Sequence, residues 1–394
     1  MVLAACLGGA APASAEKVLE RVVLVQRHGV RAPTQSPETL AAWSPRPWPN
    51  WPVPRGELTP HGREVVGLVS DAIRSHYVRA GLLPAEGCPG NGLVVWADGK
   101  DQRTRESGQA MADRLAPGCG VVAQHGPDGA VDPLFHGLQA ACKLDPDAAS
   151  AAVLAVTGTR DDLADPASAA AVRRIWDVLG RRDAPGPSSF KADAHGIRLT
   201  GPLSVAASAS EVFVLEYAEN MPLADVAWGT VPAPDALAPL LASRIRATNL
   251  TRRLPYLARR EGGRMAHLML ATLAGAPRAA EPTLGLDVRL LALAGHDTNL
   301  SQMAGVFGVE WSLPGQPDPT APATAFALER WRDPSSGAVS VALTLWYGEL
   351  DGLRRLDQAK VHGVPISLPG CPNGDCPLEA LSARILAEIP ADCR

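Results

Sequence analysis

Two short runs of apolar residues are each followed directly by a polar segment that contains a histidine. Residues 22–25 precede Arg27-His28-Gly29-Val30-Arg31, and residues 288–294 precede Gly295-His296-Asp297. Runs of mostly aliphatic residues of this length are typical of buried strands in parallel sheets. Because ligands bind in the crevice outside the carboxyl ends of such strands, we expect His28 to project into that crevice. The same layout recurs at His296.

The pattern between these strands alternates helices with further strands. Thr59-Pro60 is a helix start, helical spacing of apolar positions predicts a helix over 64–82, and a second helix is expected over 105–115. Short apolar runs predict strands at 93–96 and 120–123, and a hairpin at 323–332 and 339–347. This order predicts an α/β fold with a doubly wound, mostly parallel sheet flanked by helices and right-handed crossovers.

Two segments interrupt this pattern. Residues 35–56 are rich in Pro and Trp, so we expect a rim loop over the pocket without a regular helix. Residues 136–236 contain Ala-rich stretches at 148–156 and 164–179, which predict a mostly helical insertion domain, and a helix resumes over 237–273. The expected organisation is therefore an α/β catalytic domain of residues 16–135 and 237–394, with the smaller helical domain between its parts.

Composition narrows the classes of partner. The chain has 394 residues, of which 46% are hydrophobic and 20% charged, as in ordinary globular proteins, and its net charge is −4. Nucleic acids and anionic membranes need a clustered positive field, so we expect neither as a partner. We expect a monomer that binds a small molecule.

The first 15 residues resemble an export signal. They carry no charged residue, contain a short apolar segment at 2–7 and end in Ala13-Ser14-Ala15. A disordered cytosolic tail is the alternative, because a basic start is missing. Removal of this segment leaves six cysteines, an even number that suits disulfides in a periplasmic or secreted protein. A zinc site is the rival interpretation, but the cysteine spacing lacks a C-x2-C pair with a matching partner pair, so we expect no metal and no cofactor.

The residues around His28 suit a phosphate ester. Arg27 and Arg31 can donate bidentate hydrogen bonds to phosphate oxygens, and Gly29 would let the backbone approach an anion closely. Without a metal, hydrolysis of a phosphomonoester needs a nucleophile, positive charge and a proton for the leaving oxygen. We expect His28 to form a phosphohistidine, His296 to help surround the phosphoryl group, and Asp297 to act as general acid and then base.

The two motifs, Arg27-His28-Gly29-x-Arg31-x-Pro33 and His296-Asp297-Thr298-Asn299, together resemble the histidine acid phosphatases, a branch of the histidine phosphatase superfamily that includes bacterial phytases and glucose-1-phosphatases. Further similar segments include Trp48-Pro49-Asn50-Trp51-Pro52 and Asp101-Gln102-Arg103-Thr104. The resemblance covers nearly the whole chain after the export signal and is weakest over 138–200.

The resemblance implies further site residues. Arg103 would join the phosphate-binding arginines, and Glu211 and Arg264 would contact substrate. Independently of the resemblance, the Thr34 hydroxyl, directly after Pro33, is expected to hold a substrate oxygen near the pocket mouth. Gln35 stands where similar phytases usually have a lysine, which removes a cation suited to a highly phosphorylated substrate. The resemblance also implies three disulfides, which pair Cys88 with Cys119, Cys142 with Cys393, and Cys371 with Cys376.

Several functions remain open at this point. The resemblance favours a metal-independent acid phosphatase with phytate as the leading substrate, and a glucose-1-phosphatase or broad sugar phosphatase is the alternative, because Tyr217-Ala218-Glu219-Asn220 looks more like those enzymes. A periplasmic binding protein that kept the phosphate pocket is an alternative of another class, although such a pocket needs no proton donor. A cytosolic mutase is disfavoured by the His-Asp pair and the export signal.

Overall fold

The computed structural model describes residues 16–140, 142–281, 284–371 and 376–394. The expected export signal, residues 1–15, lies outside this range. The strands are β1 (Val18–Arg27), β2 (Leu93–Ala97), β3 (Gln124–His125), β4 (Ser189–Asp193), β5 (Gly196–Thr200), β6 (Leu290–Gly295), β7 (Ala325–Arg332), β8 (Val339–Gly348), β9 (Val361–Ile366) and β10 (Cys376–Pro377). The helices are α1 (Pro37–Trp43), α2 (Pro60–Arg79), α3 (Gln102–Leu115), α4 (Pro146–Thr157), α5 (Pro166–Val178), α6 (Pro202–Ala218), α7 (Pro234–Thr248), the π-helical turn η4 (Asn249–Arg253), α8 (Pro255–Glu261), α9 (Gly263–Leu273), α10 (Asp297–Phe307), α11 (Leu350–Arg355) and α12 (Leu378–Glu388).

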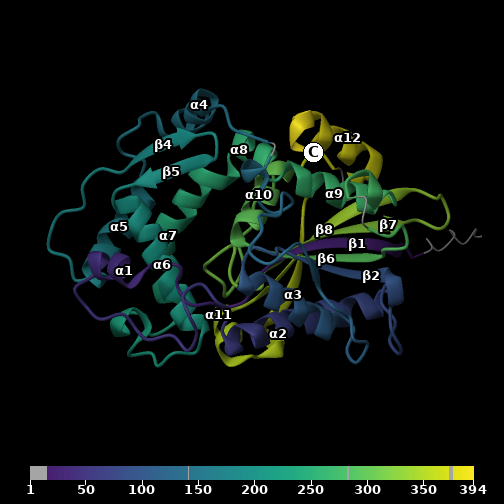
Figure 1. The fold of residues 1–394 in the computed structure, drawn as a ribbon, viewed down its shortest axis with the longest axis horizontal. Coiled ribbons are helices and arrows are strands. Elements are labelled where there is room, and N and C mark those ends of the chain that lie inside the picture. The colour runs from purple at the N-terminus through teal and green to yellow at the C-terminus, as the bar shows by residue number, and fades with distance from the viewer. Residues whose placement is uncertain (1–15, 141, 282–283, 372–375) are drawn as a thin grey trace, which may run out of the picture.

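An eight-stranded sheet forms the centre of the larger part of the molecule (Figure 1). Its order is β10-β8-β7-β1-β6-β2-β3, with β9 paired to β8. The strands β1, β6, β2 and β3 run parallel, and β7 to β10 add antiparallel pairs on the other side of β1. The expected doubly wound α/β fold is therefore confirmed, with an antiparallel half that carries the expected hairpin as β7 and β8.

The apolar run in β1 is continuous because helices cover both faces of the sheet (Figure 1). Val22 and Leu24 belong to the core on the side of α2 and α3, whereas Val23 and Val25 pack into the core formed with α9, α10 and α12. All four side chains are fully buried. Successive side chains of a strand point to opposite faces, so a strand covered on both faces has no polar position to alternate with.

The second part of the molecule contains α4 to α7 and the hairpin β4–β5, and lies beside the sheet (Figure 1). It includes the expected helices as α4 and α5, but the sequence pattern did not indicate the hairpin. Helix α7 packs against α5 and α6, so it lies with this helical part although residues from 237 onward were assigned to the sheet domain. The exact division into two domains stays a prediction.

Three local expectations differ from the structure. Residues 37–43 form the short helix α1 inside the expected rim loop, because the Ser36 side chain accepts a hydrogen bond from Thr39 N and Pro37 fits the first helical turn. Residues 120–123 form no strand, and the strand in this region is the two-residue β3, which begins directly after them. The helix expected over 237–273 is divided into α7, η4, α8 and α9, since Pro255 starts a new helix after Leu254 leaves the helical conformation.

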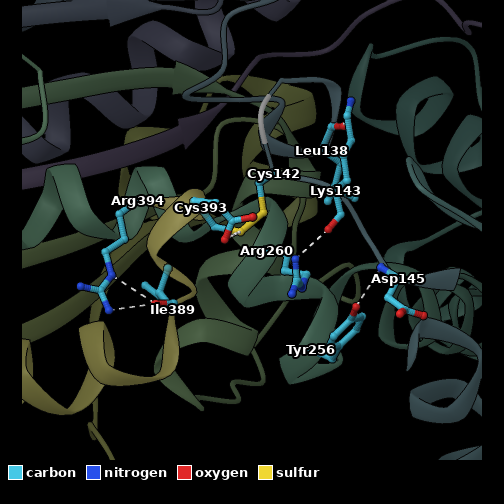
Figure 2. The surroundings of a disulfide bond; sticks show 10 residues. Leu138, Cys142, Lys143, Asp145, Tyr256, Arg260, Ile389, Cys393 and Arg394 are labelled. Atoms are coloured by element: carbon cyan, nitrogen blue, oxygen red, sulfur yellow. Dashed lines mark hydrogen bonds between the residues drawn. A yellow bond between two sulfur atoms is a disulfide. The ribbon is translucent and has the colours of Figure 1, made fainter. Parts of the chain in front are cut away.

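All three expected disulfides are confirmed. The Cα–Cα distances are 5.6 Å for Cys88–Cys119, 4.9 Å for Cys142–Cys393 and 4.7 Å for Cys371–Cys376. Figure 2 shows that Cys142–Cys393 joins the C-terminal turn to the segment before α4. Beside it, Arg260 on α8 donates to the Lys143 carbonyl at 2.7 Å. Over the described residues, we find no helix with the length and apolar character that a membrane span requires.

Candidate active site

The two histidine motifs meet at the ends of neighbouring parallel strands. Strands β1 and β6 pair so that Arg27 lies opposite Gly295, and His28 N donates to the Gly295 carbonyl at 2.8 Å. The ring centroids of His28 and His296 are consequently 5.6 Å apart, with the rings nearly perpendicular. Segments almost 270 residues apart in the sequence therefore form one site.

His28 is held as a neutral imidazole with one free nitrogen. Its side chain is buried, and Nδ1 lies 2.8 Å from the Gly29 carbonyl. Because a carbonyl only accepts, this contact assigns the ring proton to Nδ1 and leaves a lone pair on Nε2. Burial, together with the positive charges of Arg103 and Arg27, holds the pKa of His28 well below its ordinary value. The imidazole lines the cavity, so Nε2 is available as a nucleophile.

Gly29 is constrained by the place where the chain crosses α2. A Cβ at this position would lie 2.0 Å from the Gly62 carbonyl oxygen, on the first turn of α2. Gly62 has the reciprocal constraint, because its Cβ would lie 2.0 Å from the Val30 carbonyl oxygen. The two glycines therefore let the loop that carries His28 cross directly over the start of α2, which fixes the position of His28.

The three expected arginines occupy different places. Arg31 and Arg103 line the cavity. Arg27 is fully buried behind it, where its guanidinium lies 2.8 Å from Glu211 Oε1 and 3.5 Å from Asp318 Oδ2. Arg103 pairs with Asp101 at 2.8 Å. Arg27 thus contributes positive charge from behind the cavity wall, and Arg31 and Arg103 present theirs at its surface.

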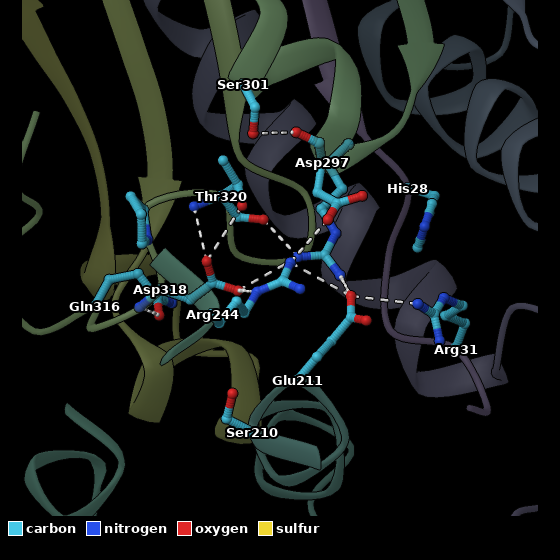
Figure 3. Close-up of polar contacts among 12 residues, drawn as sticks. His28, Arg31, Ser210, Glu211, Arg244, Asp297, Ser301, Gln316, Asp318 and Thr320 are labelled. Carbon is cyan, nitrogen blue, oxygen red and sulfur yellow. Dashed lines mark hydrogen bonds and ion pairs between the residues drawn. The ribbon is translucent and has the colours of Figure 1, made fainter. Parts of the chain in front are cut away.

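A buried network of carboxylates and arginines lies under the site (Figure 3). Arg244 on α7 is its centre, with contacts to Asp297 Oδ2 at 2.8 Å, Asp318 Oδ2 at 3.3 Å and Glu211 Oε1 at 3.4 Å. Burial alone would raise the pKa of Glu211, but the adjacent arginines, Arg244 foremost, lower it to about 2. Glu211 also lies 3.2 Å from Arg31, so it orients the arginines on both sides of His28.

Asp297 is the first residue of α10, where the helix dipole favours a negative charge. Its Oδ2 lies 2.8 Å from Arg244 and 2.6 Å from Arg252, on the turn η4. Burial works against ionisation, but Arg252, Arg27 and Arg244 outweigh it and hold the pKa of Asp297 well below its ordinary value. In the free site this carboxyl group is therefore ionised.

His296, the N-cap residue of α10, has its own carboxylate partner. Its Nε2 lies 2.7 Å from Asp98 Oδ2, and its backbone N–H donates to Asn299 Oδ1 at 2.9 Å. Burial lowers the pKa of His296, and the contact with Asp98 opposes this. Asp98 comes directly after β2, at the same edge of the sheet as His28 and His296.

The cavity between the sheet edge and the helical part has a volume of about 630 Å³. Thr34, Gln35 and Glu211 line it, as do several cationic or titratable side chains that were not among the expected residues: Lys100, His136, His195, Arg198, Arg244 and Arg252. Arg264 does not line it. Arg264 lies on α9, is half exposed, and faces Glu281 at 3.9 Å, so the structure does not bring this expected substrate contact into the cavity. Its neighbour Gly263 packs closely against Ile389, at the end of α12.

Sequence reasoning missed several residues of the site, foremost Asp98, Arg244, Arg252 and Asp318. Asp98 had a usable signal, because it follows the expected strand 93–96 as His28 follows its own strand. The two arginines lie in a region expected to be one long helix, where nothing distinguishes them from surface arginines. Asp318 lies on an irregular loop before β7, and only the fold brings it to Arg27.

Comparison with known proteins agrees with this geometry. A profile of the histidine phosphatase superfamily (branch 2) matches residues 18–168. The chain is 32% identical to the phytase AppA of Escherichia coli, over 95% of this chain and 93% of that protein, and 25% identical to a glucose-1-phosphatase of Salmonella typhimurium, over 92% and 90%.

A solved structure shows the same likeness. The Hafnia alvei phytase in complex with myo-inositol hexakis sulphate superposes with a TM-score of 0.89 at 33% identity, over 98% of this chain and 100% of that one. Since sequence and structure agree over nearly the full length of both chains, the protein belongs to the histidine phosphatase superfamily, branch 2.

Proposed function

We propose that the chain hydrolyses phosphomonoesters through a phosphohistidine at His28, without a metal, and that phytate is its leading substrate. In the first step, His28 Nε2 attacks phosphorus, the ester P–O bond breaks, and Asp297 protonates the leaving oxygen. In the second step, water attacks the phosphohistidine, Asp297 takes a proton from that water, and inorganic phosphate leaves.

The observation that carries this proposal is the state of His28. Its Nδ1 contact with Gly29 and its lowered pKa leave Nε2 unprotonated at the cavity surface. A binding pocket for phosphate would gain more from a protonated, donating histidine than from this lone pair. The same arrangement serves a nucleophile, and Asp297 supplies the proton donor that mere binding does not require.

The arginines supply charge stabilisation for the transferring phosphoryl group. Arg31 and Arg103 face the cavity and can donate hydrogen bonds to the oxygens of the phosphoryl group. His296 lies beside them, and Arg27 lies behind the cavity wall. A phosphate dianion near Asp297 repels the ionised carboxylate and competes for its arginine partners, so substrate binding raises the pKa of Asp297 toward the protonated state. We accordingly expect activity to be highest at acid pH.

The cavity supports a highly phosphorylated substrate. Beyond the residues around His28, its wall carries cationic groups on separate elements, namely Lys100, Arg198 and Arg252. They supply positive charge for phosphates other than the one transferred, although Gln35 adds none. The related Hafnia alvei phytase has been solved with myo-inositol hexakis sulphate, a ligand that carries six anionic groups on an inositol ring.

The location is proposed as periplasmic or secreted, because three disulfides suit an oxidising compartment. We further propose that the protein acts as a monomer on a small molecule, since this chain by itself supplies the expected nucleophile His28, the arginines Arg31 and Arg103, and the expected proton donor Asp297.

The test is phosphate release by the purified, disulfide-intact protein at acid pH with EDTA present, comparing phytate, glucose-1-phosphate and an aryl phosphate. We expect preferred turnover of phytate. Quenching a labelled aryl phosphate reaction in alkali should trap a phosphohistidine, and His28→Ala should remove that label. Preferred glucose-1-phosphate would assign the chain to the sugar phosphatases, and no release from any substrate would support the binding-protein alternative.

A further inference from the structure

Three potential metal ligands converge at one side of the active-site cavity. Asp98 follows β2, His136 lies on the loop that precedes a short turn at 137–139, and His296 caps α10. The Nε2 atoms of both histidines lie 2.7 Å from the same oxygen, Asp98 Oδ2. The three ligand atoms are all within 4.8 Å of one another.

Asp98 is fixed by its surroundings so that this oxygen faces the histidines. Its side chain is fully buried, and its other carboxylate oxygen accepts from Lys100 N at 3.2 Å. The Asp98 backbone carbonyl accepts from Thr104 Oγ1 at 2.7 Å, which ties it to the start of α3. Second contacts of this kind orient a carboxylate ligand before a metal arrives. His136 and His296 both line the cavity, so an ion can reach the cluster from solvent.

We propose that Asp98, His136 and His296 form a binding site for a zinc-class divalent cation that inhibits the enzyme. Two imidazoles and a carboxylate, with a fourth position open to the cavity, are a typical zinc set. Each imidazole now directs Nε2–H to Asp98, so the ion takes the place of these two protons. With bonds of about 2.0–2.2 Å, the Nε2–Oδ2 separations widen from 2.7 Å to about 3.3 Å. His136, on a loop and with its side chain 16% exposed, has room for that adjustment.

The charges around the cluster permit a cation. Asp101 Oδ2 lies 3.8 Å from His296 Nε2, and the half-buried Glu261 lines the same cavity near His136. The nearest opposing cation is Arg103, which is already engaged by Asp101 at 2.8 Å. Lys100 is half-buried, and its Nζ donates to Gln139 Oε1 at 3.4 Å. Asp98, Asp101 and Glu261 thus place three carboxyl groups beside the cluster.

An ion in this site would take His296 away from the phosphoryl group. The metal would occupy Nε2 of a ring whose centroid is 5.6 Å from that of His28. His296 could no longer adjust toward a phosphoryl oxygen, so we expect hydrolysis to slow. This consequence rests on the function proposed above, whereas binding of the ion does not.

The test measures binding and activity separately. Isothermal titration of the disulfide-intact protein, freed of EDTA, with zinc chloride at about pH 6 should show one ion per chain in the wild type. His136→Asn keeps a donor for Asp98 but removes a ligand, and should weaken binding by at least about 100-fold, the upper end of what losing an outer-shell partner costs. His195→Asn is the matched control, because His195 also lines the cavity but lies outside the cluster.

Activity is then measured on an aryl phosphate, each variant relative to its own metal-free rate. Zinc should inhibit the wild type and His195→Asn, and His136→Asn should be resistant. The absorption spectrum of bound cobalt(II) gives a readout that is independent of the titration and of the activity assay. The wild type should show the spectrum of a four-coordinate ion, and His136→Asn should lack it. The proposed site would be wrong if the wild type and His136→Asn bound zinc with equal affinity, or if the wild type bound no zinc. If zinc binds as expected but no substrate is hydrolysed by any form, the proposed function fails while the site stands.

Discussion

Arg252 Nη1 lies 2.6 Å from Asp297 Oδ2, which ties the expected proton donor to a side chain at the cavity surface. Burial raises the pKa of Asp297, and Arg252 makes the largest of the contributions that lower it. Arg244 holds the same oxygen at 2.8 Å but is nearly buried and is also bound to Asp318 and Glu211. Of the two, Arg252 is the partner that a bound phosphate can draw away.

Arg252→Gln should move the alkaline limb of the pH–rate profile upward. A general acid works only while protonated, so a depressed pKa confines activity to acid pH, and removal of Arg252 raises that pKa. We expect a shift of about one pH unit, at the low end of what one adjacent opposite charge produces. The measurement is kcat against pH with an alkyl phosphate such as glycerol phosphate.

Arg253→Gln is the matched control for this experiment. Arg253 belongs to the same turn but donates to the Val309 carbonyl at 2.9 Å and faces Glu310, away from Asp297. Its substitution should leave the limb in place. A profile that moves equally in both variants, or in neither, would show that Arg252 does not control the protonation of Asp297.

Asp297→Asn should harm alkyl phosphates more than aryl phosphates. Asparagine keeps the shape of the side chain but supplies no proton, and an aryloxide leaves without one more readily than an alkoxide. We expect kcat on glycerol phosphate to fall by about 10²–10⁴-fold, the usual worth of general acid catalysis, with a smaller loss on an aryl phosphate. Equal losses on both substrates would mean that Asp297 only positions other groups.

The local parts of this site could be predicted from sequence. His28 and His296 each follow a run of mostly apolar residues, and the burial of such a run on both faces of a sheet is a property of consecutive residues. The strand end then fixes where the next side chain points. The same reasoning would have found Asp98, which follows the strand 93–96.

The partners of Asp297 could not be predicted in this way. Arg244 and Arg252 lie on α7 and η4, and their roles depend on how these elements pack over the sheet edge. Helical periodicity places an arginine on a polar face but does not say which carboxylate it meets. Gly29 shows the same limit, because its close neighbour is Gly62, on a helix whose crossing the local sequence does not specify.

Glu216→Gln should make stability less dependent on pH. Glu216 is buried, with Oε2 accepting from Ala227 N at 2.9 Å, and burial raises its pKa from 4.5 to about 8. The folded state therefore keeps a proton that the unfolded state loses, so this contribution to stability is full below about pH 4.5 and is lost as the pH rises to about 8. Glutamine cannot ionise and can still accept from Ala227.

The measurement is the melting temperature at about pH 5 and at about pH 8. These two values enclose most of the pH range over which the contribution of Glu216 is lost. The wild type should melt lower at the higher pH, and in Glu216→Gln the difference should shrink by at least about 2 °C. Glu219, whose pKa burial raises to about 7, should leave some of the dependence in place. Glu310→Gln, at an exposed carboxylate, is the control. Parallel curves for the wild type and Glu216→Gln would contradict the assignment.

The disulfide Cys142–Cys393 should stabilise the fold more than Cys371–Cys376. It spans 251 residues and ties the C-terminal turn to the segment before α4, whereas the other pair spans five. A cross-link restricts the unfolded chain more when it closes a longer loop, and loss of a native disulfide typically costs about 2–5 kcal/mol. The double variant Cys142→Ala/Cys393→Ala should therefore melt well below Cys371→Ala/Cys376→Ala. Neither pair lines the cavity, so both variants should keep phosphatase activity at low temperature. An equal loss of melting temperature in the two variants would show that loop length does not decide their contributions.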